Sequence, residues 1–227
     1  MEILNVTATA LQFLREKIIT AELKSGQKLN EASLSVNLGI SRPPLREAFR
    51  LLEKDHLVVN IPRKGTFVTE LSTKDYEEVS QIRQMIECYA IDLLKVSNVR
   101  ELPKVNLTLE RASKLPMPIN TVEPVELLNR IRVFLEFHNS LVESSGNLRL
   151  TNIYHSISFN LARYQFIYFH IHGTAQHSLD DHKKILGFIK NGNYDQAKEE
   201  LRKHVDYAVE LVKNKIADST VASAGKF

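Results

Sequence analysis

The sequence has no tryptophan, only one cysteine and no long hydrophobic run. The single Cys88 excludes a disulfide within the chain and fits a reducing compartment, where it is most simply a small core residue. No stretch approaches the roughly 18 uninterrupted apolar residues of a transmembrane helix, and the start, MEILNVTA, lacks the basic and apolar regions of a secretory signal. We therefore expect a soluble, cytoplasmic protein without a membrane partner.

Excess charge of one sign is also absent over the whole chain. The formal net charge is only +3 in 227 residues, a length that suits one large domain or two modest ones, and the 43% of hydrophobic residues supports a core. Between residues 42 and 64, however, six basic side chains face three acidic ones. This local excess of positive charge indicates a nucleic-acid contact confined to one region.

Residues 29 to 55 have the pattern of two short helices joined by a tight turn. We expect helices at Glu31–Leu38 and from Arg42 to about Asp55, with Gly39 in the turn and Ser41 capping the second helix. Two prolines follow Arg42, in the first helical turn, where a missing N–H costs nothing. They favour the start of the second helix.

The second helix has two chemically different faces. At about 100° per residue, one face is apolar and the other basic. The apolar face carries Leu45, Ala48, Phe49 and Leu52, and the basic face carries Arg42, Arg46 and Arg50. Guanidiniums suit phosphate oxygens and the O6/N7 edge of guanine, and a DNA major groove admits a helix. A charged face that is merely solvated is the alternative.

A basic hairpin follows and favours the DNA-binding interpretation. Leu57–Ile61 and Thr66–Thr69 read as short strands around the tip Pro-Arg-Lys-Gly, in which Lys64 and Gly65 stand next to the second strand. A helix-turn-helix with a basic wing is a much narrower signal than a charged helix alone. The sequence therefore predicts a winged helix-turn-helix that binds double-stranded DNA.

From residue 75 onward the pattern is helical only. We expect a mainly α protein with a winged helix-turn-helix domain at 1–69, a linker at 70–74, an all-helical antiparallel bundle at 75–217 and a flexible tail at 218–227. The expected helices are 9–23 in the first domain, and 75–97, 102–114, 123–143, 147–170, 174–191 and 193–215 in the second. Such a bundle can enclose a small-molecule pocket and supply a homodimer interface.

Three histidines are placed alike on the apolar faces of different expected helices. They are His138, His182 and His204. One inward histidine is usually a hydrogen-bonded core residue. Three that converge can instead share a divalent metal ion.

The run LKSGQKLNEASLSVNLGISRPPLREAFRLLEKDHLV, with RKGTFV after it, resembles the winged helix-turn-helix of the GntR-type bacterial transcriptional regulators. The resemblance covers about residues 8 to 69, and Ser25 replaces the usual proline before a loop glycine. It implies that Arg42 and Arg46 contact the operator, together with Lys64 and Gly65 of the wing. Ser41 and Arg50 are our further DNA-binding candidates.

Residues 75 to 215 resemble the helical effector (FCD) domain of the FadR-type subfamily. The matching motifs are Arg83-x-x-x-Glu87, Phe137-His138, Ser145-Gly146-Asn147, Asp181-His182, and Asp195-x-Ala197 before His204. The resemblance implies zinc or nickel on the three histidines. It also implies an aspartate ligand four residues before the first histidine, where this chain has Phe134, so any metal site is weaker or differently completed.

The same resemblance implies an effector site. Arg83 would hold an effector carboxylate, although an Arg83–Glu87 surface pair explains the spacing nearly as well. Asn147 is either a further pocket residue or a helix cap.

We expect a sequence-specific, homodimeric transcriptional regulator, controlled by a small organic acid. An architectural DNA-binding protein with a vestigial pocket is one alternative. A three-histidine metal hydrolase fused to a DNA-binding module is another. The second is disfavoured because no phosphate loop, nucleophile elbow or HExxH motif is present, so we do not expect an enzyme.

Overall fold

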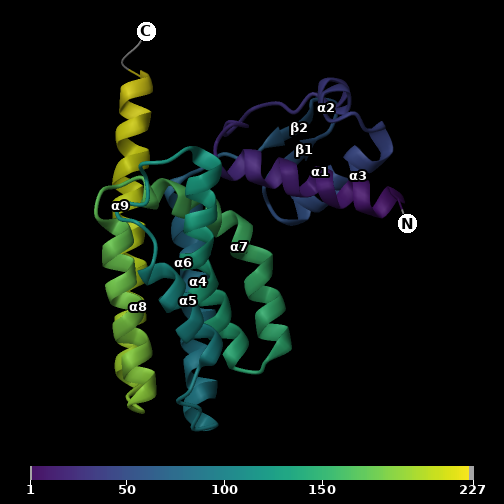
Figure 1. The fold of residues 1–227 in the computed structure, drawn as a ribbon. Coiled ribbons are helices and arrows are strands. Elements are labelled where there is room, and N and C mark those ends of the chain that lie inside the picture. The colour runs from purple at the N-terminus through teal and green to yellow at the C-terminus, as the bar shows by residue number, and fades with distance from the viewer. Residues whose placement is uncertain (1, 225–227) are drawn as a thin grey trace. The chain divides into compact units, whose positions relative to one another are not determined.

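The chain folds into two compact units, divided between Leu71 and Ser72. The computed structural model describes the backbone of residues 2–224 and the side chains of residues 6–218. We call residues up to Leu71 the reader unit and residues from Ser72 onward the helical unit (Figure 1). The predicted mainly helical fold, with a small hairpin in the first unit, is confirmed.

The reader unit has three helices followed by a β-hairpin. These elements are α1 (Glu2–Ile19), α2 (Glu31–Leu38), α3 (Arg42–Lys54), β1 (Val58–Ile61) and β2 (Gly65–Val68). Helix α2 begins where the Asn30 side chain accepts a hydrogen bond from the Ser33 amide and ends at Gly39 in the left-handed conformation. Its short turn brings α3 against α1, where Leu14 and Leu45 are fully buried.

The hairpin strands pair antiparallel, with Val58 opposite Val68 and Ile61 opposite Gly65. The turn between them has positive φ at Arg63 and at Gly65, and Gly65 is at 105°, which side chains disfavour. Strand β1 starts one residue later than expected, and β2 starts and ends one residue earlier than expected. The basic residues Arg63 and Lys64 lie exposed at the hairpin tip.

The helical unit consists of long helices packed side by side (Figure 1). They are α4 (Thr73–Val96), α5 (Pro103–Ser113), α6 (Pro124–Ser144), α7 (Leu148–Phe169), α8 (Thr174–Lys190) and α9 (Tyr194–Ala224). Helix α4 packs against α6, α7 and α9, and α9 also packs against α8. Side chains from α4, α6, α8 and α9 can therefore meet inside the unit.

Several helix bounds also differ from the sequence-based expectation, most of all those of α1, α4 and α9. Helix α1 begins at Glu2, earlier than residue 9, and α4 begins at Thr73, inside the expected linker. Helix α9 continues to Ala224, past the expected helix end and into the expected tail. Residues 225–227, the end of that tail, lie outside the described residues.

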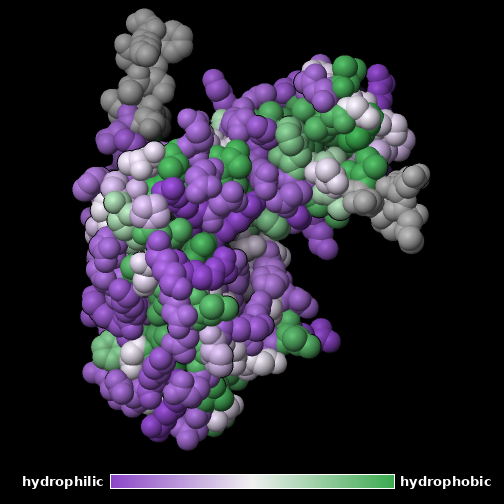
Figure 2. All heavy atoms as spheres, in the orientation of Figure 1, coloured by the Kyte–Doolittle hydropathy of each residue, from purple (hydrophilic) through white to green (hydrophobic). Residues whose placement is uncertain are grey.

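The surface is mostly polar. Figure 2 shows a hydrophilic face on the helical unit, with hydrophobic side chains exposed in small groups. Within the described residues, no helix combines the length and the hydropathy that crossing a membrane requires.

Candidate functional site

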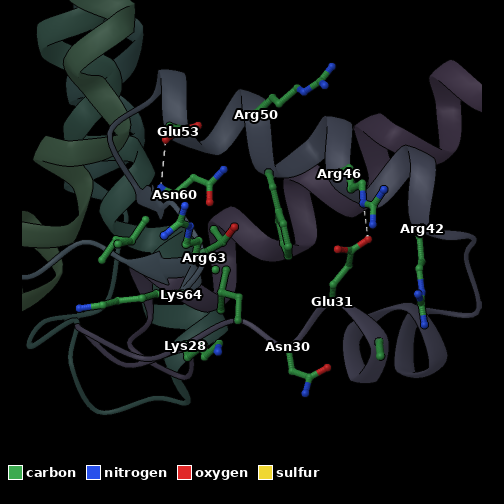
Figure 3. A pocket seen from close by; sticks show the side chains of 16 residues that line it. Lys28, Asn30, Glu31, Arg42, Arg46, Arg50, Glu53, Asn60, Arg63 and Lys64 are labelled. Atoms are coloured by element: carbon green, nitrogen blue, oxygen red, sulfur yellow. Dashed lines mark hydrogen bonds and ion pairs between the residues drawn. The ribbon is translucent and has the colours of Figure 1, made fainter.

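A basic groove lies between α2, α3 and the hairpin of the reader unit (Figure 3). Its volume is about 700 Å³. Its basic lining residues are Lys28, Arg42, Arg46, Arg50, Arg63 and Lys64. Gly65 lines it as well, so the two elements expected to contact DNA, the second helix and the wing, border one surface.

Helix α3 presents the two faces that its sequence predicts. Leu45, Ala48, Phe49 and Leu52 are buried, whereas the three arginines of the helix are exposed. Ser41 occupies the N-cap position, but its side chain makes no capping hydrogen bond. The expected side-chain cap is therefore wrong, and the Ser41 hydroxyl is not used in capping the helix.

Acidic residues connect this surface to its surroundings. Glu31 of α2 accepts a hydrogen bond from Arg46 Nε at 2.6 Å, and the Asn60 amide of β1 donates to Glu53 of α3 at 3.0 Å. The second contact joins the hairpin to α3. Sequence reasoning missed Glu31, Asn60 and the groove residue Lys28, because their proximity to α3 depends on the tertiary fold.

The second site is a buried polar cluster in the helical unit. Glu87 of α4 lies at its centre, with no exposed side-chain surface. It accepts hydrogen bonds from Arg83 Nε at 2.8 Å, from His138 Nδ1 at 2.8 Å and from the Tyr154 hydroxyl at 2.7 Å. Arg83 also donates to His138 Nε2 at 2.7 Å. Arg83 and Glu87 do pair, but in the core and not on the surface.

These contacts fix the charge states. Burial alone would raise the pKa of Glu87, but His138 and Arg83 hold that pKa well below its usual range. Burial lowers the pKa of His138 to about 3, and the Arg83 charge acts in the same direction. The cluster thus contains an ion pair and a neutral imidazole at neutral pH.

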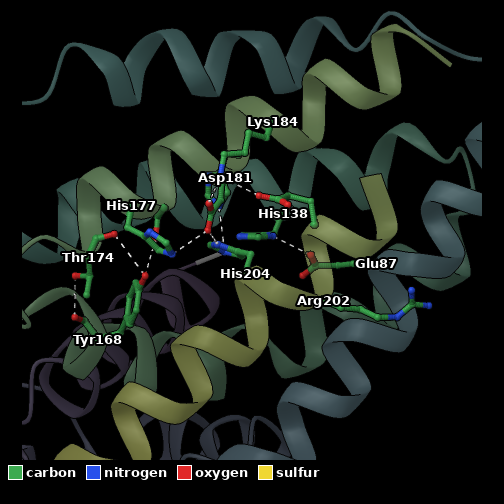
Figure 4. Close-up of polar contacts among 12 residues, drawn as sticks. Glu87, His138, Tyr168, Thr174, His177, Asp181, Lys184, Arg202 and His204 are labelled. Carbon is green, nitrogen blue, oxygen red and sulfur yellow. Dashed lines mark hydrogen bonds and ion pairs between the residues drawn. The ribbon is translucent and has the colours of Figure 1, made fainter. Parts of the chain in front are cut away.

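The three predicted histidines do converge. One potential ligand atom from each of His138, His182 and His204 lies within 4.8 Å of the others, and all three residues are buried. His204 Nδ1 lies 3.3 Å from an Asp181 carboxylate oxygen, and its Nε2 lies 3.3 Å from His182 Nε2. Figure 4 shows Asp181 beside His204 and Glu87 beside His138.

The two carboxylates select the histidine tautomers. Because a carboxylate only accepts hydrogen bonds, Nδ1 of His138 and Nδ1 of His204 carry the proton, and their Nε2 lone pairs face inward. Carboxylates hold metal-ligating histidines in this way. Within the described residues, the buried Nδ1 of His182 has no hydrogen-bond partner. The imidazole nitrogens of the three histidines fit a divalent cation. To bind His138 Nε2, the cation must displace the Arg83 side chain that donates a hydrogen bond to it.

Burial also keeps the other two histidines neutral. It lowers the pKa of His182 well below its ordinary value, and it lowers that of His204 although Asp181 opposes the change. Burial would raise the pKa of Asp181, but the contacts with His204, His177 and Lys184 lower it overall. Metal ions bind the neutral imidazole, so no deprotonation is needed.

Phe134 occupies the position, four residues before His138, at which the resemblance to the FCD domain implies an aspartate ligand. Its ring is buried, lies 6.2 Å from the His182 ring and packs against Phe169 at 4.8 Å. Glu136, the acidic residue next in sequence, pairs with Arg111 on the exposed side of α6. The wall of the site beside His182 is therefore aromatic.

Asn147 acts as a helix cap. Its side-chain oxygen accepts a hydrogen bond from the Leu150 amide at 3.1 Å at the start of α7. Asn147 was expected to be either a pocket residue or a helix cap, and the structure shows that it caps α7.

Comparison with known proteins assigns the chain to a family. Residues 7–68 match the model of the bacterial regulatory proteins of the gntR family, and residues 78–207 match the FCD domain model. The chain belongs to the GntR family. It is a DNA-binding transcriptional regulator with a helical FCD domain, and not an enzyme.

Relatives and solved structures agree with this assignment. An uncharacterized HTH-type transcriptional regulator of Bacillus subtilis, YdhC, is 31% identical to this chain over 208 residues. The match covers 90% of this chain and 91% of YdhC. The gluconate operon transcriptional repressor of Bacillus licheniformis is 23% identical, covering 85% and 79%. A putative transcriptional regulator GntR from Rhodococcus sp. RHA1 shares the fold, with a TM-score of 0.72, 23% identity and coverage of 91% and 96%.

Proposed function

We propose that this GntR-family protein is a homodimeric regulator whose operator affinity is controlled by a small carboxylate bound in the helical unit. The observation that carries the proposal is the buried cluster around Arg83 and the three histidines. Charged groups in a helical core are costly and rarely kept for stability alone. A ligand-binding role explains why the core contains them.

Arg83 is the residue that we propose binds the carboxylate of the effector. Its guanidinium is buried, and a planar fork of donors matches a carboxylate. A relative is named as a gluconate operon repressor, and gluconate carries a carboxylate. Asn147 remains a weaker effector-binding candidate, because its side chain is already used as a cap.

A zinc or nickel ion on His138, His182 and His204 is the cofactor we propose. The inward lone pairs and the unpartnered His182 nitrogen support it. When bound, the ion supplies a positive centre for an anionic effector. The chain's own residues hold the imidazoles in place, through Glu87 and Asp181, and exclude water with the rings of Phe134 and Phe137.

The proposed DNA contact lies in the reader unit. It consists of Arg42, Arg46 and Arg50 of α3, together with Ser41, Lys64 and Gly65. Two recognition helices on successive major grooves of a near-palindromic site multiply the contacts, which is why we propose a dimer. An effector changes operator affinity only by binding the two arrangements of the dimer unequally.

The test begins with a DNA site selected by the protein from random duplexes. Arg46→Ala should weaken binding to that site by about 1–3 kcal/mol if Arg46 contacts a base. Elemental analysis of untagged protein, beside a His182→Ala variant, then tests the metal. Equal, near-zero metal in both proteins would remove the cofactor from the proposal.

A panel of carboxylates tests the effector. Binding to the native state raises the thermal midpoint of unfolding, and the effector should also release the selected DNA. A protein that binds DNA but responds to no carboxylate or metal would support the alternative, an architectural protein with a vestigial pocket.

A further inference from the structure

Glu31 lies against the guanidinium of the central arginine of α3 (Figure 3). Its Oε1 accepts a hydrogen bond from Arg46 Nε at 2.6 Å, although the two residues belong to different helices. The side chain of Glu31 is 30% exposed and that of Arg46 is 64% exposed. The carboxylate is thus the more enclosed partner, and the guanidinium projects into the groove.

Local structure holds Glu31 in place. It stands in the first turn of α2, directly after Asn30, which caps that helix. Unpaired backbone N–H groups at a helix N-terminus favour a negative charge there. The turn at Gly39 then sets the position of α3 relative to this carboxylate.

The contact uses only one of the five N–H donors of Arg46. In the part of the chain that the structure describes, the terminal nitrogens Nη1 and Nη2 have no other protein partner. The pair of terminal donors is the edge that binds O6 and N7 of guanine. A carboxylate behind the guanidinium also repels DNA phosphates, so it disfavours the use of Arg46 as a backbone contact.

We propose that Glu31 is a positioning residue that fixes Arg46 for reading a base and thereby sets the sequence preference of the regulator. This inference rests on the proposed DNA contact of Arg46. Without Glu31, Arg46 becomes a mobile positive charge that contacts the phosphates of any duplex. Binding to unrelated DNA then rises while the advantage of the preferred site falls.

The test compares two duplexes of equal length and base composition. One is the site enriched by the wild-type protein from random DNA, and the other is its shuffled version. Glu31→Ala should bind the shuffled duplex more tightly and lower the preference, the ratio of the two dissociation constants, by about fivefold or more. Glu31→Gln, which keeps the acceptor oxygen, should retain part of the preference.

A double variant shows whether Glu31 acts through Arg46. In an Arg46→Ala background, Glu31→Ala should leave the preference unchanged. Glu70→Ala is the matched control for charge, because Glu70 is an exposed carboxylate of the reader unit that contacts neither Arg46 nor another proposed DNA-binding residue. It should tighten binding to both duplexes alike, with the preference kept within about twofold.

The outcomes separate this inference from the proposed function. If no DNA is enriched, the proposed DNA contact fails and the inference with it. If a site is enriched and Glu31→Ala keeps the full preference, Glu31 has no positioning role, although the regulator stands. An equal loss of preference with and without Arg46 also overturns the inference. Misfolding does not confuse the result, because exposed ion pairs add little to stability.

Discussion

Glu87 carries a full negative charge inside the helical unit without contact with water. Arg83, His138 and Tyr154 all donate to it. Glu87→Gln leaves the Arg83 charge uncompensated in the core. We expect the free energy of unfolding to fall by about 3–5 kcal/mol, because one partner of a buried ion pair cannot be removed cheaply.

Urea unfolding followed by circular dichroism measures this loss. Glu78→Gln on the same helix is the control, because its pair with Lys74 spans 3.7 Å at the surface and should contribute little. Arg83→Met combined with Glu87→Leu should recover part of the stability lost in Glu87→Gln. Similar unfolding midpoints for the two single variants would show that the cluster is not an ion pair in solution.

The neutral histidines make the metal-free protein sensitive to mild acid. His138 has a pKa of about 3 in the folded state, against about 6.5 when unfolded, so below pH 6.5 the unfolded state binds more protons. Stability is present above pH 6.5 and is lost as the pH falls toward 3. His138 alone should cost about 2 kcal/mol between pH 7 and pH 5.

Unfolding free energies of chelator-treated protein at pH 7 and pH 5 check this dependence. His155 is exposed on α7, so His155→Asn should show the same loss as the wild-type protein. A stability that does not change over this interval would mean that the buried imidazoles titrate normally.

At the scale of elements, the aromatic wall on α6 limits the proposed metal site. Phe134 lies one helical turn before His138, on the same face. Phe134→Asp should raise the affinity for zinc, because a carboxylate adds an anionic ligand to a set of neutral imidazoles. Phe134→Asn, of the same size but neutral, is the matched control.

Zinc titration of the two variants distinguishes the effect of the added negative charge from the effect of the smaller side chain. We expect the aspartate variant to bind at least about tenfold more tightly than the asparagine variant. Equal affinities would show that Phe134 does not face the ion.

Patterns within one element predicted the helices well, and contacts between elements escaped prediction. The arginine stripe of α3 and the inward histidines follow from spacing along a helix, and the structure agrees with both. The burial of Arg83 depends on how α6 and α7 pack over α4. The sequence pattern of α4 alone does not predict that packing. The Glu31–Arg46 contact likewise depends on the angle of the turn at Gly39.

The histidine cluster shows the same division. Spacing indicated that His204 points inward, but not that Asp181 of α8 would fix its tautomer. The spacing of Arg83 and Glu87 allowed a pair between them, which we considered as the alternative and only at the surface. The contact of Glu87 with Tyr154 could not be expected, because Tyr154 comes from α7, far away in sequence. Signals of this kind become visible only once helices are placed side by side.

For the molecule as a whole, dimerisation is the remaining expectation. Helix α4 leaves Ile82, Met85 and Tyr89 exposed along one stripe, and Met85 is 65% exposed. Such a stripe on a charged surface suits a second copy of the same helix. Met85→Asp places a charge in the proposed interface, so we expect it to convert the dimer into a monomer.

Sedimentation velocity and binding to the selected DNA site test this together. The variant should sediment as a monomer and lose affinity for a site with two half-sites, because each recognition helix then binds alone. Leu107→Asp on α5 makes the same chemical change at another exposed position and should leave the dimer intact. If Met85→Asp stays dimeric with full DNA affinity, the interface lies on another face and the α4 stripe has no part in holding two reader units on one operator.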